Sequence, residues 1–243
     1  MLCYKAWRES QTRFVLSALT IAGLCALFVL FQGDARAGFD GAPLTYAGYI
    51  WRIIYKGYLR ELYVFLVLLL GVGGLLRERA YGTVGFTLAL PVSRWRLVSA
   101  RALIGLSEVA ILAFLPALVV PVLSPFVHES YPWTQAIQFS LLWTVGGTLV
   151  FAIAFLASVV FGGEYSAPVV AFVVLLAYSA IADLPALDRF DVHDMMSGTG
   201  TPYFRLDDFL ITGPLPWMAM AVIMLVSCCM VVLAGRITEA QDL

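Results

Sequence analysis

The chain has 243 residues, of which 61% are hydrophobic and only 13% charged, and its net charge is −1. With a mean hydropathy of +0.90, it has too little charge to solvate the surface of a globular protein of this length. The composition therefore indicates a membrane protein with the lipid bilayer as a partner, and it excludes the strongly basic balance typical of nucleic-acid binding.

The N-terminal 31 residues predict an amphipathic interfacial helix followed by a first span. Residues 1–13 mix Tyr4 and Trp7 with acidic and basic residues, a pattern typical of a helix that lies at headgroup level. Residues 14–31 are then apolar for long enough to cross a hydrocarbon core of about 30 Å. A cleaved signal peptide is the weaker alternative, because the apolar run is long and more such runs follow.

The apolar runs together predict an all-α polytopic membrane protein with six transmembrane helices in a single domain, residues 1–243. The expected spans are residues 14–31, 58–76, 102–127, 137–161, 167–182 and 215–234.

The segments around these spans carry further signals. Between the first two spans, the Tyr- and Trp-rich residues 44–57 predict a surface-lying helix at the membrane interface, with a sugar-binding patch as the lesser alternative. Pro116, Pro121 and Pro125 predict a kink or break near the outer end of the third span. Residues 183–214 form an acidic loop whose role the sequence leaves open.

Basic residues set the expected orientation. Residues 77–101 hold five of the 15 Lys and Arg residues, between two long apolar runs. Positive charge in short loops marks the cytoplasmic side, so this segment and both termini are expected in the cytoplasm. In this topology nine of the 15 basic residues lie inside and the other six outside.

The motifs of common enzyme classes are missing, so no catalytic, cofactor-binding or metal-binding residue is expected. The only two lysines, Lys5 and Lys56, do not follow glycine, and the chain therefore has no P-loop. His128-Glu129 has no second histidine after it, and the G-x-S-x-G pattern is missed by one residue around Ser107. The four cysteines show no framework spacing and are expected to be free, buried thiols.

Glu108 is the candidate functional residue within a span. A carboxylate about two turns inside the third span costs roughly 2.5 kcal/mol or more unless it is paired or hydrated. Arg101 lies seven residues earlier on nearly the same helix face. Two interpretations stay open: a structural pair with Arg101, or a role at a water-filled path or a subunit interface.

Residues 77–101 also have an ordered local pattern. Thr83 is placed to cap a short helix over residues 84–90 that carries Phe86 and Leu88. Pro91 ends this helix, and the residues after it start the third span. The spacing Glu78-x-x-x-Gly82-Thr83 followed by Pro91-Val92-Ser93-Arg94, directly after the second of six spans, resembles the permease subunits of ABC-2 type transporters, the type-2 ABC exporters.

The resemblance implies a permease in the bacterial inner membrane (the plasma membrane) with a cytoplasmic coupling helix between helices 2 and 3. It implies as partners a cytoplasmic ABC ATPase subunit, which binds the ATP, and a second permease copy or paralogue. The implied coupling residues are Arg77, Glu78, Gly82, Thr83, Phe86, Leu88, Pro91 and Arg94.

Alternatives to transport remain. The five arginines can be read as a topology signal only, in which case the chain is a membrane-embedded enzyme or an assembly factor without transport activity. An ion channel would need polar residues repeated along one span, and the sequence shows none. The transported substrate is not readable, although the lack of polar spans favours an amphiphilic or lipid-like cargo.

Overall fold

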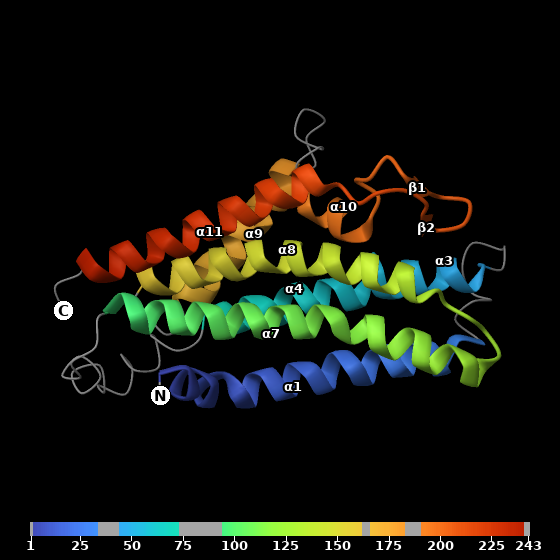
Figure 1. Cartoon of the computed structure of the whole chain (residues 1–243), viewed down its shortest axis with the longest axis horizontal. Coiled ribbons are helices and arrows are strands. Elements are labelled where there is room, and N and C mark those ends of the chain that lie inside the picture. Colours follow the sequence, from blue (N-terminus) through green and yellow to red (C-terminus); the bar gives the residue numbers. More distant parts are fainter. Residues whose placement is uncertain (1, 34–43, 73–93, 162–165, 183–190, 241–243) are drawn as a thin grey trace.

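A computed structural model describes residues 2–33, 44–72, 94–161, 166–182 and 191–240, which fold into an elongated bundle of helices (Figure 1). In hydrocarbon a helix satisfies its backbone groups internally, so apolar runs of this kind fold as helices. The elements are α1 (Leu2–Leu30), α3 (Tyr46–Ile50), the π-helix η1 (Trp51–Tyr55), α4 (Tyr58–Gly71), α7 (Arg94–Leu123), the 3₁₀-helix η2 (Ser124–Val127), α8 (Trp133–Val160), α9 (Ser166–Ala182), α10 (Val192–Ser197), β1 (Phe204–Arg205), β2 (Leu210–Ile211) and α11 (Trp217–Ala240).

Four helices are long and apolar enough to cross a membrane. They are Cys3–Leu30, Trp95–Val127, Trp133–Val160 and Trp217–Ala240. The described part of the chain is thus a mostly helical protein with four candidate spans. Helix α9 is apolar but shorter, and the 14 residues of α4 extend only about 21 Å at 1.5 Å per residue. Fewer helices therefore meet the length criterion than the six spans predicted.

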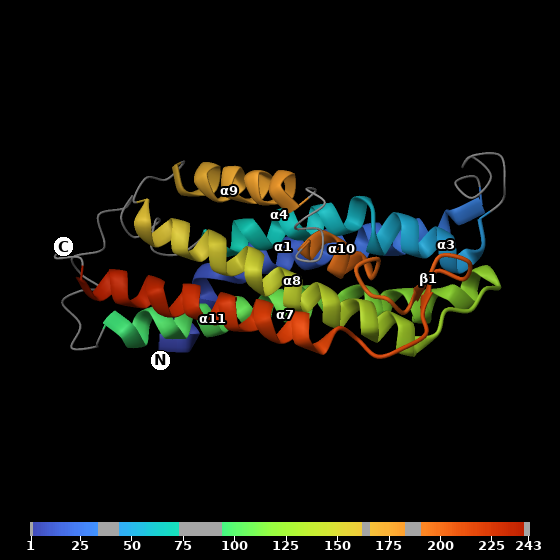
Figure 2. The ribbon, with the colours of Figure 1, turned by 90° about the horizontal axis from the view of Figure 1, so that it is seen from above.

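Helix α8 is the centre of the bundle. It packs against α4, α7, α9, α10 and α11, and α9 lies at one edge of the bundle with α7 and α11 at the other (Figure 2). Gly147 brings α4 and α7 close, because a Cβ atom there would lie 2.1 Å from the Tyr63 hydroxyl and 2.9 Å from Val109 Cγ1. The Tyr63 hydroxyl in turn donates to the Trp143 carbonyl at 3.1 Å. The middle of the bundle is therefore tightly packed.

The start of α1, the start of α7 and the end of α11 lie at one end of the bundle (Figure 1). Helices α1 and α7 run parallel, and they pack along each other. We call this the terminal end, and the other the far end.

The predicted separation of an interfacial helix from the first span is not seen. Residues 2–30 form one continuous α-helix, so the polar residues before Phe14 belong to the same helix as the apolar run. The physical reason is that Glu9, Ser10 and Arg13 find partners on neighbouring helices, described below, and do not need the headgroup interface.

The described boundaries of other predicted spans also differ. Helix α7 begins at Arg94 instead of residue 102, and α11 continues to Ala240 instead of ending at residue 234. In both cases polar residues at the helix end extend it past the apolar run. Helix α7 passes through Pro116 and Pro121, and it ends at Leu123, where the 3₁₀-helix containing Pro125 follows. The predicted break is therefore located at the last of the three prolines.

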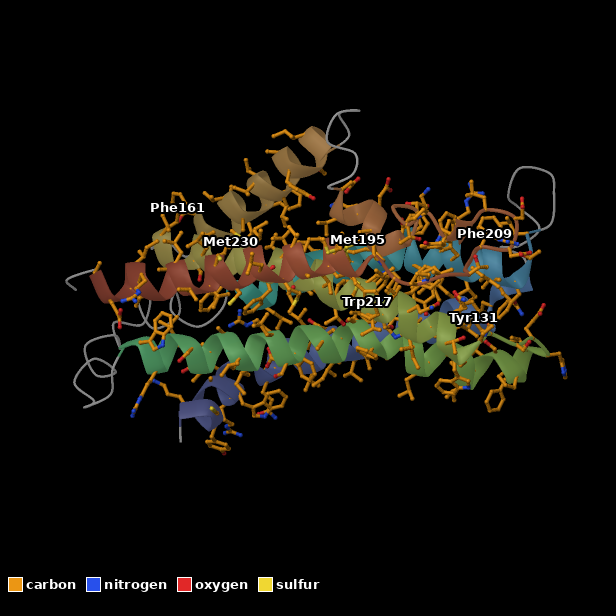
Figure 3. All side chains as sticks on the ribbon, turned by 45° about the horizontal axis from the view of Figure 1, so that its top comes forward. Tyr131, Phe161, Met195, Phe209, Trp217 and Met230 are labelled. Atoms are coloured by element: carbon orange, nitrogen blue, oxygen red, sulfur yellow. The ribbon has the colours of Figure 1, made fainter. Side chains whose placement is uncertain are left out.

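A cap made of α3, η1, α10 and the β1–β2 hairpin covers the far half of the bundle. Figure 3 labels Met195 of α10 and Phe209 of the hairpin there, with Tyr131 nearby. The Trp51 ring packs on Phe204 and Phe209 at centroid distances of 5.0 and 5.2 Å, and its indole nitrogen donates to the Ser197 carbonyl at 2.8 Å.

This packing corrects the predicted surface-lying helix over residues 44–57. A helical segment exists at residues 46–55, but Tyr46, Tyr49, Trp51 and Tyr55 are each at most 5% exposed. The hairpin covers Trp51, and the three tyrosines contact η2, Tyr131, α1 and α8. Their faces are therefore not available to stack on a sugar. Burial also raises the pKa of Tyr131, between η2 and α8, above its usual range, so this phenol stays neutral.

All four cysteines are free, as expected, but only Cys25 is buried. The expected burial is wrong for Cys3, near the start of α1, and for Cys228 and Cys229, because α11 turns much of its apolar surface outward. An outward apolar face is normal for a helix surrounded by lipid.

Candidate functional site

Most of the predicted coupling residues lie outside the described residues. They are Arg77, Glu78, Gly82, Thr83, Phe86, Leu88 and Pro91. Their proposed roles stay predictions. Arg94 is described, as the first residue of α7, so the third predicted span is a direct continuation of this segment.

Glu108 is almost fully buried, with 1% of its surface exposed. The Ser10 hydroxyl of α1 donates a short hydrogen bond to its carboxylate Oε1. The positive charge of Arg13, one helical turn further along α1, also attracts this carboxylate. The desolvated charge of Glu108 is thus stabilised from α1.

Arg101 pairs with another residue than the one its spacing suggested. Its Nη2 lies 3.1 Å from Oε2 of Glu9, and the Arg101 side chain is only 7% exposed. Lys5 Nζ approaches the other Glu9 oxygen at 3.9 Å. The carboxylate that binds the Arg101 guanidinium therefore comes from α1, and Glu108 has its own partners. The structural pair of Glu108 with Arg101 is replaced by two contacts between helices.

These side chains form one cluster, which we call the α1–α7 polar cluster: Glu9, Ser10, Arg13, Arg101 and Glu108. They line a small cavity of about 30 Å³, closed on its other sides by Leu70 of α4 and by the rings of α8. Such a volume holds one or two water molecules, since one water needs at least about 10–15 Å³. Arg13 Nη1 also donates to the Leu69 carbonyl at 3.2 Å, which connects the cluster to α4.

The α1–α7 polar cluster has two carboxylates and two guanidinium groups, so its formal charge is zero. Opposite charges held close together in a poorly solvated place fix how two helices align, because a shift along the axis separates both pairs. The cluster can therefore hold the first third of α7 in register with α1. Its small cavity leaves room for water and none for a larger ligand.

Sequence reasoning found Glu108 but missed Glu9, Ser10 and Arg13. A signal was present: α1 carries an acid followed by a base, Glu9 and Arg13, and α7 carries a base followed by an acid, Arg101 and Glu108. On parallel helices these sequences are complementary. The prediction that residues 1–13 lie at the interface left these charges without a protein partner.

Metal ligands do not gather anywhere in the described part of the chain, where no three His, Cys, Asp or Glu side chains converge. His193 lies in α10, where its backbone nitrogen donates to the Asp191 side chain at 2.7 Å and its carbonyl accepts from Arg60 at 2.9 Å. These contacts give Asp191 and His193 a structural role in the cap.

Comparison with known proteins gives no relative: no protein-family model matches the chain, and a search of curated proteins finds no significant match.

Proposed function

We propose that the chain is the permease subunit of an ABC exporter of the ABC-2 type. In this proposal it has six spans, α4 (with η1 before it) and α9 being the two beyond the four long helices. It works in the plasma membrane, the bacterial inner membrane, with both termini in the cytoplasm. It pairs with a second permease copy or paralogue and with a cytoplasmic ABC ATPase subunit that binds the ATP.

The arrangement of the helices supports this topology. The start of α1, the start of α7 and the end of α11 share the terminal end of the bundle (Figure 1). The basic residues at that end include Lys5, Arg8, Arg96 and Arg236, and an excess of basic residues is typical of the cytoplasmic side.

The observation that carries the proposal is the connection between α7 and α1. The predicted coupling segment leads into α7 at Arg94, and two turns later Arg101 binds Glu9 of α1. One further contact, Ser10 with Glu108, lies two turns beyond. A force applied to the coupling segment would therefore move α7 and α1 together, which is what a helix that transmits the ATPase cycle has to do.

The ATPase partner supplies the chemical step, and this chain changes its helix packing in response. Buried ion pairs tolerate two discrete arrangements better than small continuous displacements, because intermediate positions leave charges unpaired. Binding of ATP in the partner would shift α7 with α1 relative to α8. The substrate would then pass along the interface with the second permease.

The experiment is to coexpress the permease with any ABC ATPase whose gene neighbours its own and to purify the complex in one detergent. Glu78→Ala, and Pro91→Ala combined with Gly82→Val, are expected to leave membrane insertion intact but to release the ATPase or to uncouple its activity. The matched control is Glu239→Ala, which removes a partly exposed acid near the end of α11. ATPase activity and the amount of copurified partner are measured for all variants.

A result in which the partner binds and hydrolyses ATP identically with all variants would reduce residues 77–101 to a topology signal. The orientation is tested separately by cysteine labelling of intact cells. Single cysteines at residues 80–95 should be inaccessible from outside, and those within residues 185–205 should be labelled at exposed positions such as Pro202 and Arg205. Labelling of the 80–95 segment from outside would end the six-span proposal.

A further inference from the structure

A groove runs between α7 and α11 in the half of the bundle near the terminal end, and α8 forms its floor. We call it the α7–α11 groove. Its volume is about 340 Å³, and its walls include Ala102, Leu103 and Leu106 of α7 and Met224, Cys228 and Val231 of α11. This volume is at the lower limit of the roughly 300–1,000 Å³ typical of ligand sites.

The groove offers no free polar group to a ligand. Its hydroxyl side chains, Ser99, Thr148 and Ser227, donate to carbonyl groups of their own helices at 2.7, 2.7 and 2.8 Å. Polar ligands would lose their hydration here without gaining a hydrogen bond. An alkyl chain meets no such penalty, and the lining therefore selects for one.

Both helices that border the groove are candidate membrane spans, so the groove opens toward hydrocarbon. A cavity of this size left empty would forfeit the dispersion contacts of its whole lining. The acyl chains of surrounding lipids are the apolar groups available to fill it. An acyl chain alone would be held without preference, however, because lipid tails are as apolar as the side chains they replace.

Basic residues at the terminal end of the groove supply a preference for one class of lipid headgroup. Here the Trp95 ring packs directly on Gly235, where a Cβ atom would lie 2.1 Å from the ring, and this contact closes the groove. Arg96 is exposed and precedes Ser99 by three residues, so it extends the α7 face that lines the groove. Arg236, directly after Gly235 on α11, has a side chain that is 75% exposed, and its ion pair with Glu239 at 3.7 Å is a surface contact that a phosphate would replace.

We propose that the α7–α11 groove binds one acyl chain of an anionic phospholipid, whose headgroup phosphate pairs with Arg96 and Arg236. Two flexible guanidinium groups at the closed end of an apolar groove match the two parts of such a lipid. The lipid would join α7 to α11 in the leaflet at the terminal end. The proposal requires the membrane location of the protein but not its pairing with an ATPase.

The first test is native mass spectrometry of the protein after exchange into phosphatidylglycerol or phosphatidylcholine with identical acyl chains. The wild type is expected to retain one phosphatidylglycerol with a preference on the order of tenfold, from two arginines near the phosphate. Cys228→Trp fills the groove and should abolish this retention. Cys229→Trp, on the exposed neighbouring position, is the matched control and should retain the lipid. Arg96→Gln with Arg236→Gln should remove the preference for phosphatidylglycerol.

A second measurement avoids a bulky change in case Cys228→Trp does not fold. In variants that keep either Cys228 or Cys229 as the one exposed cysteine, maleimide labelling in nanodiscs should be slowed by phosphatidylglycerol at Cys228 only. The proposal is overturned by equal retention of both lipids, by lipid loss in the Cys229→Trp control, or by equal labelling rates at the two cysteines. Loss of a dimer in Cys228→Trp, with lipid retention unchanged, would instead identify a second copy as the occupant.

Discussion

The assignment of Arg101 to Glu9 makes a quantitative prediction. Removing one partner of a fully buried ion pair destabilises a protein by about 3–5 kcal/mol. The Glu9 side chain is 27% exposed, so Glu9→Gln, which leaves the Arg101 guanidinium buried, is expected to cost about 3 kcal/mol, the low end of that range. Arg101→Met leaves a carboxylate that water and Lys5 can reach, and about 1 kcal/mol is expected.

The double variant is expected to be about as stable as Arg101→Met alone, because it leaves no unpaired charge. The coupling between the two positions is then about 2–3 kcal/mol, at the upper end of the values measured for residues in contact. Thermal unfolding in one detergent measures it, since 1 kcal/mol shifts the melting temperature of a chain of this size by about 2–4 °C. The control is a second double-mutant cycle that combines Arg101→Met with Glu108→Gln. A coupling free energy of only about 0.5 kcal/mol is expected between these two positions.

The reasoning is refuted if Arg101 couples to Glu108 at least as strongly as to Glu9. Such a result would restore the pair within α7 and remove the ionic connection between α7 and α1. Glu108→Gln by itself should fold, because the amide oxygen still accepts from Ser10. If this variant assembles normally and transports like the wild type, the Glu108 charge has no role in a substrate path.

Two further predictions concern the middle of the bundle and use the same unfolding assay. Tyr63→Phe is expected to lower stability by about 1 kcal/mol, because its hydroxyl donates to the Trp143 carbonyl. Tyr55→Phe is expected to raise the stability by about 1 kcal/mol, because the buried Tyr55 hydroxyl has no partner among the described residues. Equal losses of stability in the two tyrosine variants would contradict this assignment. Gly147→Ala is expected to cost about 1–3 kcal/mol from the clash with Tyr63. The control is Gly23→Ala, because no atom lies near a Cβ at that position, and a gain in stability of up to about 1 kcal/mol is expected there. Equal effects of the two alanine substitutions on stability would exclude packing as the cause.

Hydropathy alone predicted where the apolar helices lie, because the length and polarity of each run are local properties. It placed the third span at residues 102–127, and the structure has helix from Arg94 to Val127. Hydropathy does not predict which residue a polar side chain contacts. The charges of residues 1–13 were therefore assigned to the headgroup interface, whereas Glu9 and Arg13 contact α7 and α4.

The same limitation explains the errors at Arg101 and in the aromatic segment. Seven residues separate Arg101 from Glu108 on one helix face, and this local spacing was preferred to the complementary charges of α1, because hydropathy does not predict that α1 and α7 pack in parallel. Tyr46, Tyr49 and Trp51 have the composition of an interface helix, but their partners belong to distant elements. Trp51 packs on Phe204 and donates to the Ser197 carbonyl, 146 positions later, and Tyr46 hydrogen-bonds to Ser124, 78 positions later. Contacts of such high sequence separation depend on the topology of the whole bundle.

The two halves of the bundle are held together by different kinds of contact, and this bears on how the proposed transporter would move. In the far half Tyr55 stacks on Phe139 at a centroid distance of 4.4 Å and meets Trp143 edge-on at 5.8 Å, and Gly146 meets Met196 of the cap without space for a Cβ atom. Close-packed rings of this kind have no second arrangement of similar energy. The terminal half instead contains the α1–α7 polar cluster with its cavity and the α7–α11 groove, which leave space for side chains to repack. In the proposed transporter, a movement that begins at Arg94 would therefore be absorbed first by repacking of the terminal half, and it would reach the far half only as a displacement of the aromatic cluster and cap as one rigid body.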